Sequence, residues 1–427
     1  MPIPLPAQYI FFMMKWIILV VGLMNVALAQ KSAAVEKQLI QNLKTHIQFL
    51  ASDSLEGRRT GTKGEMLAAH YIANKFAEYG LMPKGDYKYF EMPSFDQQFI
   101  IQAKDSVTKK TRTGKNVIAY IDNKAPYTVI LGAHFDHLGY GEDHNSMYTG
   151  STPIIHNGAD DNASGTAALL ELARLLKKEK KPPYNYLFIA FSGEELGLFG
   201  SKYFVEHPTI DLQKVDYMIN MDMVGRLNDS THNLTIGGVG TSPSWGSIIS
   251  TPNASFTIKI DSSGVGPSDH TSFYRKNIPV LFFFTGLHQD YHKPSDDFDK
   301  INYSGEAKII MFIQQIIHKT YASDKLIFTK TKEQTIGDKH AMRVSLGIMP
   351  DYTFSSEGVR VDGISEGKPA QKAGLQPGDI IIQIEAWKIT DVKSYMKILS
   401  EEKLHKGYAT TVTIKRNNEI LTIPITF

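Results

Sequence analysis

The sequence predicts an α/β fold, with a mainly parallel mixed sheet flanked by helices, followed by a small β-rich domain. Short apolar runs with the composition of buried strands alternate with segments of helical period through most of the chain. Strands that alternate with helices favour parallel pairing, because each crossover helix returns the chain to the same end of the sheet. After about residue 341, short strands separated by turn residues replace this alternation.

The expected elements follow one another in chain order. Apolar residues at helical spacing predict a helix at 35–50, and the capping-box spacing of Thr62 and Glu65 opens a second helix that ends near Tyr79. Further strands are expected at 99–102, 116–121, 128–132, 186–191, 215–221 and 280–284, and further helices at 166–178, 198–207 and 304–319. Ligands of such sheets bind beyond the carboxyl ends of the strands, so a functional site is expected there.

Residues 1–29 have the organisation of a secretory signal peptide. Lys15 precedes a short apolar run that ends at Ala29 after small residues. The run is shorter than the roughly 20 residues of a membrane span. An uncleaved anchor is the alternative, because residues 9–14 add apolar length upstream. We expect an exported protein, periplasmic or secreted, with no stable membrane span after the leader is removed.

The remaining chain divides into two predicted domains. Residues 30–320 carry the strand and helix alternation, residues 321–340 are polar and without period, and residues 341–427 form the β-rich domain. The middle segment is therefore expected to be a linker.

Composition excludes several classes of function. Lys and Arg number 46 against 44 Asp and Glu, so the chain lacks the basic excess of a nucleic-acid-binding protein, and we expect no nucleic-acid partner. The chain has 0 cysteines, which excludes disulfides, thiol nucleophiles and cysteine-based zinc sites. Any zinc must be held by His, Asp and Glu.

Five segments place metal-type ligands directly after predicted strands. They are His134-Phe135-Asp136, Asp160-Asp161-Asn162, Glu194-Glu195, Asp222 and Tyr291-His292. Each motif alone is commonly structural, but a parallel sheet brings all five together. Two divalent ions held about 3.5–4 Å apart need anionic ligands and a bridging carboxylate, and imidazoles suit zinc. The set therefore predicts a two-metal site.

Two spacings suggest roles within this set. His134 and Asp136 lie two residues apart, so an extended backbone directs both to one side, where Asp136 can accept from the histidine and fix its tautomer. Glu194 and Glu195 are adjacent and point in different directions. One can bind metal while the other acts as general base. Four other histidines are expected to be ordinary loop residues: His137, His144, His156 and His288.

With these motifs, residues 35–320 resemble the bacterial leucyl aminopeptidase/aminopeptidase Y family of co-catalytic zinc peptidases, and the segment from Gly57 to Glu65 looks like the family's N-terminal signature. The resemblance implies a zinc aminopeptidase-like fold, two Zn²⁺ per chain, and peptide substrates with a free N-terminus. The metal ligands that it implies are His134 and Asp222 for one zinc, Glu195 and His292 for the other, and Asp161, rather than Asp160, as the bridge.

The resemblance also implies catalytic roles. Glu194 would be the general base on a metal-bridging water and would pass the proton to the leaving amine. Tyr291, which precedes the histidine ligand, would stabilise the oxyanion.

The C-terminal segment resembles a PDZ domain. Arg343-Val344-Ser345-Leu346-Gly347-Ile348 is similar to the carboxylate-binding loop, and Ala373–Ile381 is the more specific match. The resemblance implies that an extended C-terminal peptide adds to the sheet edge, with its carboxylate received by backbone N–H groups around Leu346, Gly347 and Ile348. The alternative is a PDZ domain that only packs on the catalytic domain.

Three other functions stay open. The metal ligands do not determine which chain end is read, so carboxypeptidase or dipeptidase specificity is possible. A glutaminyl-cyclase-like acyltransferase shares the fold but resembles this set with a single zinc, and the doubled ligand count argues against it. In a non-catalytic PDZ scaffold, Glu194 or a ligand would be lost, and none is.

Overall fold

The computed structural model describes residues 33–427 except 87, 90–91, 105–109, 144, 149, 151, 251–254, 332–343, 351–356, 365–366, 400, 402 and 418. The predicted signal peptide at 1–29 lies outside these residues, so it stays a prediction. Within the described part of the chain, no helix is long and apolar enough to cross a membrane.

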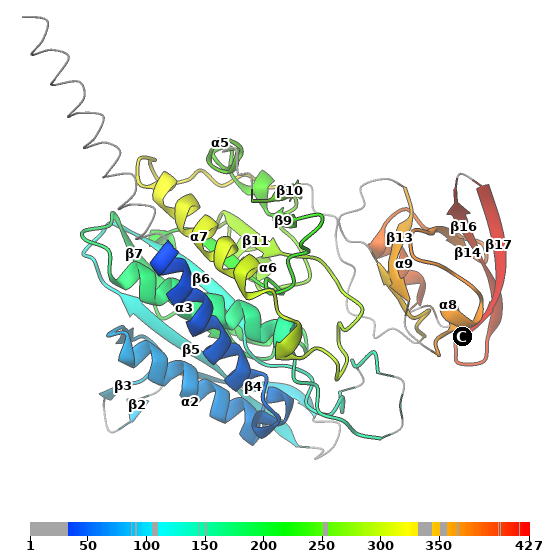
Figure 1. Ribbon diagram of the computed structural model, residues 1–427, viewed down its shortest axis with the longest axis horizontal. Coiled ribbons are helices and arrows are strands. Elements are labelled where there is room, and N and C mark those ends of the chain that lie inside the picture. The colour runs from blue at the N-terminus through cyan, green and yellow to red at the C-terminus, as the bar shows by residue number, and fades with distance from the viewer. Residues whose placement is uncertain are drawn as a thin grey trace, which may run out of the picture.

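A nine-stranded mixed sheet forms the centre of the first domain (Figure 1). Its strands lie in the order β1 (Met82–Pro83), β5 (Thr111–Ile121), β7 (Tyr184–Phe191), β6 (Tyr127–His134), β8 (Val215–Met221), β11 (Val280–Phe284), β9 (Asn233–Gly237) and β10 (Thr257–Ile260), and β4 (Asp96–Lys104) pairs with β5. The central strands β7, β6, β8 and β11 are parallel to their neighbours in this group, whereas β5 and β9 pair with the group in antiparallel fashion. The predicted mainly parallel mixed sheet is confirmed.

Helices cover both faces of this sheet. A helix at 33–50, α2 (Lys63–Glu78), α3 (Gly165–Lys177), α5 (Trp245–Ile249) and α7 (Tyr303–Thr320) belong to one core, and α4 (Phe199–Glu206) and α6 (His270–Tyr274) belong to the other. Successive residues of a strand enter opposite cores: Val129 and Leu131 of β6 join the first, and Ile130 joins the second. Strands buried on both faces explain the nearly continuous apolar runs in the sequence.

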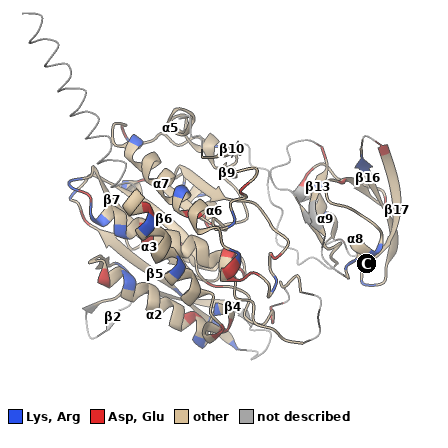
Figure 2. Ribbon diagram, in the orientation of Figure 1, with Lys and Arg blue, Asp and Glu red and all other residues tan. Residues whose placement is uncertain are grey.

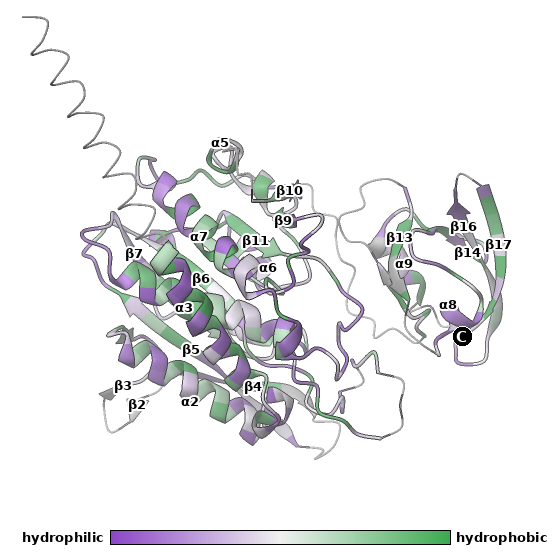
Figure 3. Cartoon of the chain, viewed as in Figure 1, coloured by the Kyte–Doolittle hydropathy of each residue, from purple (hydrophilic) through white to green (hydrophobic). Residues whose placement is uncertain are grey.

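Polar residues are distributed accordingly. Figure 3 shows the central strands mostly apolar and the helices mixed, and Figure 2 shows charges mainly on the helices and in the loops. Charges beside the carboxyl ends of the strands are therefore exceptions that need a reason, since burying an unpaired charge is costly.

The start of α2 connects to the strand that leads to the two glutamates. Thr62 caps the helix, as the sequence predicts, with its Oγ1 accepting from the N–H of Glu65. The carboxylate of Glu65 does not complete the expected capping box. It accepts instead from the N–H of Gly61 at 2.6 Å and from the hydroxyl of Ser192 at the end of β7. Burial raises the pKa of Glu65 to about 7.

The residues expected to begin the linker lie against the first domain. Leu326 is buried, and its N–H donates to Oδ1 of Asp216 at 2.6 Å. The hydroxyls of Thr331 and Tyr274 lie 3.0 Å apart. Residues 321–331 therefore extend the packing of the first domain, and 332–340 lie outside the described residues.

The second domain has a sheet and a core of its own. Its strands lie in the order β12 (Ile348–Pro350), β13 (Val359–Ile364), β14 (Ile380–Ile384), β16 (Ala409–Arg416) and β17 (Glu419–Thr426), with β15 (Trp387–Lys388) beside β14 and the helices α8 (Pro369–Lys372) and α9 (Val392–Leu399). In the first domain, β2 (Lys88–Tyr89) and β3 (Met92–Pro93) form a separate two-stranded sheet.

Candidate metal centre

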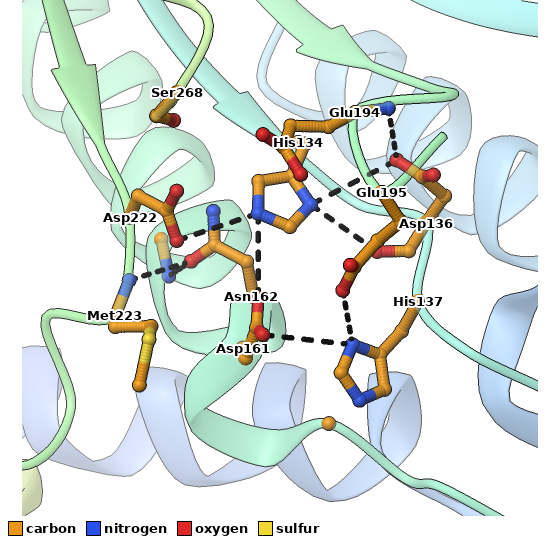
Figure 4. Close-up of polar contacts among 12 residues, drawn as sticks. His134, Asp136, His137, Asp161, Asn162, Glu194, Glu195, Asp222, Met223 and Ser268 are labelled. Carbon is orange, nitrogen blue, oxygen red and sulfur yellow. Dashed lines mark hydrogen bonds and ion pairs between the residues drawn. The ribbon is translucent and has the colours of Figure 1, made fainter. Parts of the chain in front are cut away.

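The predicted ligands meet near the carboxyl ends of the central strands, and Figure 4 shows His134, Asp161, Glu195 and Asp222 of this set. His134 ends β6, Asp222 follows β8 directly, and Glu194 and Glu195 follow β7 after a turn at Gly193, whose φ of 69° suits glycine. Parallel strands place these positions side by side, although they are far apart in the sequence.

The carboxylate of Asp161 lies between two imidazoles. Its Oδ1 is 3.4 Å from Nε2 of His134, and its Oδ2 is 3.2 Å from Nε2 of His292. One carboxylate thus reaches both histidines, which is the arrangement of a bridging ligand. Asp160 contacts a different histidine, with its Oδ2 at 3.1 Å from Nε2 of His288. Asp161, and not Asp160, therefore lies between the two predicted histidine ligands, and its bridging role stays a prediction.

Each of these two histidines also faces a second carboxylate. Nε2 of His134 lies 3.3 Å from Oδ1 of Asp222, and Nε2 of His292 lies 3.3 Å from Oε2 of Glu195. Two triads of one nitrogen and two oxygens therefore share Asp161. Nitrogen and oxygen donors in this proportion are a ligand set that zinc accepts, so the side chains fit zinc.

The charges of the site also favour bound cations. Burial raises the pKa of Asp161 to about 7 and raises the pKa of Glu194 well above its ordinary value. Burial would raise the pKa of Glu195 too, but His292 and His137 hold it well below its ordinary value. Carboxylates crowded together in a partly buried site repel one another, and divalent cations relieve that repulsion.

Asp136 contacts His134 differently from the expectation. The backbone oxygen of Asp136 lies 3.2 Å from Nδ1 of His134, whereas the carboxylate Oδ1 is 3.8 Å away, beyond hydrogen-bond distance. The carboxylate instead accepts from the hydroxyl of Thr60 at 2.8 Å and from the N–H of Glu194 at 3.2 Å. The chain turns after β6, so the main chain, rather than the side chain, of Asp136 orients the histidine.

The signature segment, Gly57 to Glu65, packs against the backbone that carries the site. Arg58 is fully buried and donates to the backbone carbonyls of Phe135 at 2.7 Å, Asn157 at 2.6 Å and Gly158 at 3.0 Å. These carbonyls belong to the segments next to His134 and Asp161. Burial lowers the pKa of Arg58 to about 10, so it stays charged at neutral pH. A single guanidinium therefore holds the segment next to His134 against the segment next to Asp161, the predicted bridging ligand.

His137 belongs to the site, contrary to the expectation of an ordinary loop residue. Its Nδ1 lies 2.8 Å from Oε1 of Glu195, and its buried Nε2 has no hydrogen-bond partner among the described residues. Burial lowers the pKa of His137 to about 3, so the ring is neutral and Nδ1–H donates to the carboxylate. The only signal in the sequence is its position next to the His134-Phe135-Asp136 motif. His288 also lies next to the site, through Asp160, and His144 lies outside the described residues.

A pocket opens beside these ligands. Asp161, Glu194, Glu195, Asp222 and His292 lie at one side, and its apolar lining is formed by Met223, Val265, Phe282, Phe284 and Leu287. Tyr291 also lines the pocket, and its ring stacks on that of His292 with centroids 3.9 Å apart. The tyrosine predicted to act on the oxyanion is thus adjacent to a predicted ligand.

In the second domain, the predicted carboxylate-binding loop precedes an edge strand. Leu346 and Gly347 directly precede β12, which begins at Ile348. Gly347 has φ 78°, and an added Cβ would lie 2.1 Å from Cβ of Lys368, so only glycine fits there. The strand ends at Pro350, which has no N–H to offer.

Comparison with known proteins relates both domains to families. Residues 116–317 match peptidase family M28, and residues 331–427 match the PDZ domain. Aminopeptidase YwaD of Bacillus subtilis is 29% identical over 226 residues, which cover 48% of this chain and 46% of that protein. The chain spans less than half of the length of the first curated relatives, with shares of 46%, 46% and 39%.

Solved structures share the fold. BSAP, a zinc aminopeptidase from Bacillus subtilis, superposes with a TM-score of 0.52 at 18% identity, covering 69% of this chain and 96% of that one. A glutaminyl cyclase from Porphyromonas gingivalis gives a TM-score of 0.51 at 17% identity, covering 66% and 98%. Fold alone does not separate these two activities. By these matches, residues 116–317 carry the sequence pattern of peptidase family M28 on the fold of zinc aminopeptidases, and residues 331–427 carry that of a PDZ domain.

Proposed function

We propose that this protein is an exported, zinc-dependent aminopeptidase that removes N-terminal residues from peptides. The observation that carries the proposal is the position of Asp161 between two histidines, each of which faces a second carboxylate. The match to peptidase family M28 and the name of the relative from Bacillus subtilis support it.

The side chains divide into two sets of ligands. His134 and Asp222 would hold one zinc ion, Glu195 and His292 would hold the other, and Asp161 would contact both. The chemistry that zinc supplies when bound is polarisation of the scissile carbonyl and a lowered pKa for water.

Glu194 would act as the general base. It accepts the proton of the attacking water and returns it to the leaving amine, which therefore departs neutral. Its backbone is held by the hydrogen bond from its N–H to Asp136, and its side chain lines the pocket beside Asp222. Tyr291, from the other side of the pocket, would donate its phenolic hydrogen to the developing oxyanion.

The preference for a free N-terminus would arise at the metal centre. Of the four carboxylates close to the reacting centre, Asp161, Glu195 and Asp222 would be neutralised as zinc ligands, which leaves Glu194. A free α-amino group can offer its lone pair to zinc and its N–H to a nearby carboxylate, whereas an acetylated amine has no free lone pair to offer.

The test is hydrolysis of aminoacyl-p-nitroanilides and of their N-acetylated forms, with zinc measured by elemental analysis. We expect two zinc ions per chain and cleavage of the free-amine substrates only. Release of C-terminal residues would instead support a carboxypeptidase. Conversion of N-terminal glutamine to pyroglutamate without hydrolysis would support a cyclase.

For the second domain, we propose that an extended C-terminal peptide adds to the edge strand β12. The match to the PDZ domain and the loop at Leu346, Gly347 and Ile348 support this assignment. Export rests on residues 1–29 alone, and the mass of the mature protein would test it.

A further inference from the structure

The pocket beside the metal centre has a polar end as well as apolar walls. Thr235, Asp261 and Ser263 line it together with the apolar residues. Asp261 follows β10, at the edge of the sheet, whereas His134, Glu195 and Asp222 lie at the ends of β6, β7 and β8 (Figure 1). Two strands, β11 and β9, lie between β8 and β10. Asp261 is therefore placed away from the metal centre, at the far end of the same pocket.

Strand pairing connects the two ends. Phe282 of β11 pairs with Gly237 of β9, and the N–H of Asp261 donates to the carbonyl of Ile236, directly before Gly237. An added Cβ at Gly237, which lines the pocket, would lie 3.3 Å from Cβ of Phe282, so a side chain at this position would press on Phe282. Neighbouring strands lie about 4.8 Å apart, and two such intervals separate β11, which carries Phe282, from β10.

The walls between the two ends are aromatic. The rings of Phe282 and Phe284 stack with centroids 5.9 Å apart, and His270 stacks on Phe282 at 4.5 Å. Burial lowers the pKa of His270 to about 3, so this ring is uncharged at neutral pH. Neutral aromatic rings accommodate the alkyl part of a side chain and attract a cation at its end.

Among the residues that the structure describes, no cation balances Asp261. Its carboxylate accepts from the N–H of Ser263 at 2.9 Å, and no ion pair is formed with a basic side chain in the described residues. Surrounding protein raises the pKa of Asp261, although the side chain is still exposed to solvent. A partly enclosed carboxylate without a counter-ion gains most from a ligand that brings a positive charge.

We propose that Asp261 selects substrates whose N-terminal residue is lysine or arginine, with the aliphatic stem along the aromatic wall that Phe282 and Phe284 form and the cationic head at the carboxylate. This inference rests on the proposed aminopeptidase function and names its substrate class. Asp261 is a specificity residue and takes no part in the chemical step.

The test compares lysine with norleucine, which has a similar apolar stem and no charge. We expect the wild-type enzyme to have a higher kcat/KM for lysyl- and arginyl-p-nitroanilide than for the norleucyl substrate. Asp261→Asn keeps an oxygen to accept from Ser263. It should lower kcat/KM for the cationic substrates about 10- to 100-fold, as loss of a charge-assisted contact does, and leave the norleucyl substrate within about twofold.

Asp324→Asn is the matched control, because Asp324 is exposed and does not line the pocket. This control should leave kcat/KM unchanged for both the lysyl and the norleucyl substrate. Equal effects of Asp261→Asn on lysyl and norleucyl substrates, or a wild-type preference for norleucine, would overturn the inference while leaving the aminopeptidase function intact.

A binding measurement separates the two proposals. Calorimetry of the zinc-loaded protein with free L-lysine and L-norleucine needs no turnover. We expect tighter binding of lysine, and loss of that difference in Asp261→Asn. Equal affinities in the wild type would overturn the inference even in a protein that hydrolyses nothing. Selective binding of lysine by a protein that hydrolyses nothing would support the role of Asp261 and contradict the proposed aminopeptidase function.

Discussion

The carboxylate of Glu195 is shared between two histidines: Oε1 lies 2.8 Å from Nδ1 of His137, and Oε2 lies 3.3 Å from Nε2 of His292. His137 is buried, and the hydrogen bond from its Nδ1–H leaves Oε2 directed at the predicted second metal site. The neutral imidazole of His137 thus orients the carboxylate of Glu195 through the oxygen that does not face His292.

Replacing His137 should lower the affinity for the zinc ion predicted at Glu195 and His292, and leave the affinity of the other site unchanged. His137→Ala removes the donor, and loss of such a supporting contact costs about 10- to 100-fold in metal affinity. His137→Asn keeps an N–H donor and should retain most of the wild-type zinc affinity. Zinc titration against a competing chelator measures both sites. Two sites of wild-type affinity in His137→Ala, with a normal circular dichroism spectrum, would contradict the orienting role.

Glu194→Gln should separate metal binding from turnover. The amide cannot take a proton from water, so kcat should fall by about 10²- to 10⁴-fold, while elemental analysis still finds two zinc ions. Glu206→Gln, in an exposed part of α4, is the control and should keep the wild-type rate. A normal rate in Glu194→Gln would remove this residue from the role of base.

Removal of zinc should lower the stability of the first domain. The carboxylates of Asp161, Glu195 and Asp222 then face one another without a cation. Ligand binding to the folded state alone contributes about 2.7 kcal/mol per site at a hundred times the dissociation constant. We expect the Tm to fall after chelation and to recover with zinc. Asp161→Asn should bind at most one zinc ion and show a smaller recovery; a full recovery in that variant would exclude a bridge at Asp161.

Glu306 should make the protein less stable as the pH rises. It is fully buried in α7, neither carboxylate oxygen has a hydrogen-bond partner among the described residues, and burial raises its pKa well above the ordinary 4.5. Above that value the unfolded chain releases a proton that the folded state keeps, so the free energy of unfolding decreases with pH.

The variant Glu306→Gln removes this titration. It should be more stable than the wild type at pH 8, by about 1–3 kcal/mol, and the difference should shrink towards pH 4.5, near the ordinary pKa of the carboxyl. Urea unfolding at several pH values measures the difference. A constant difference across this range would show that Glu306 has the same pKa in both states.

Truncation should distinguish the two domains. A chain that ends at residue 340 keeps the contacts of Leu326 and Thr331 with the first domain and should hydrolyse small substrates at about the full-length rate. A chain that ends at residue 320 loses these contacts and should have a lower Tm. Loss of activity in a folded 1–340 chain would mean that the PDZ domain contributes to the active site.

Periodicity was sufficient to predict most of the sheet. The strands that carry the site are buried on both faces, so their apolar runs stand out, as at 186–191 and 215–221. The short strands β9 and β10 were missed, because five and four residues without a continuous apolar run resemble loops. They are also the strands that bring Asp261 to the pocket.

By itself, the sequence determined the fold class and the ligand types, because hydrophobic period and the absence of cysteine are local or compositional properties. It also singled out His134, Asp161, Glu195, Asp222 and His292, and expected all of them directly after strands. That expectation was wrong for Asp161, which lies in the turn 159–164 before α3, and for His292, which lies in the loop after β11. Only the tertiary structure decided which atoms meet: the backbone of Asp136 rather than its carboxylate at His134, His137 behind Glu195, and Asp261 across two strands from the metal centre. Such contacts depend on strand register and on the turns after each strand, and both are settled by packing between segments distant in the chain.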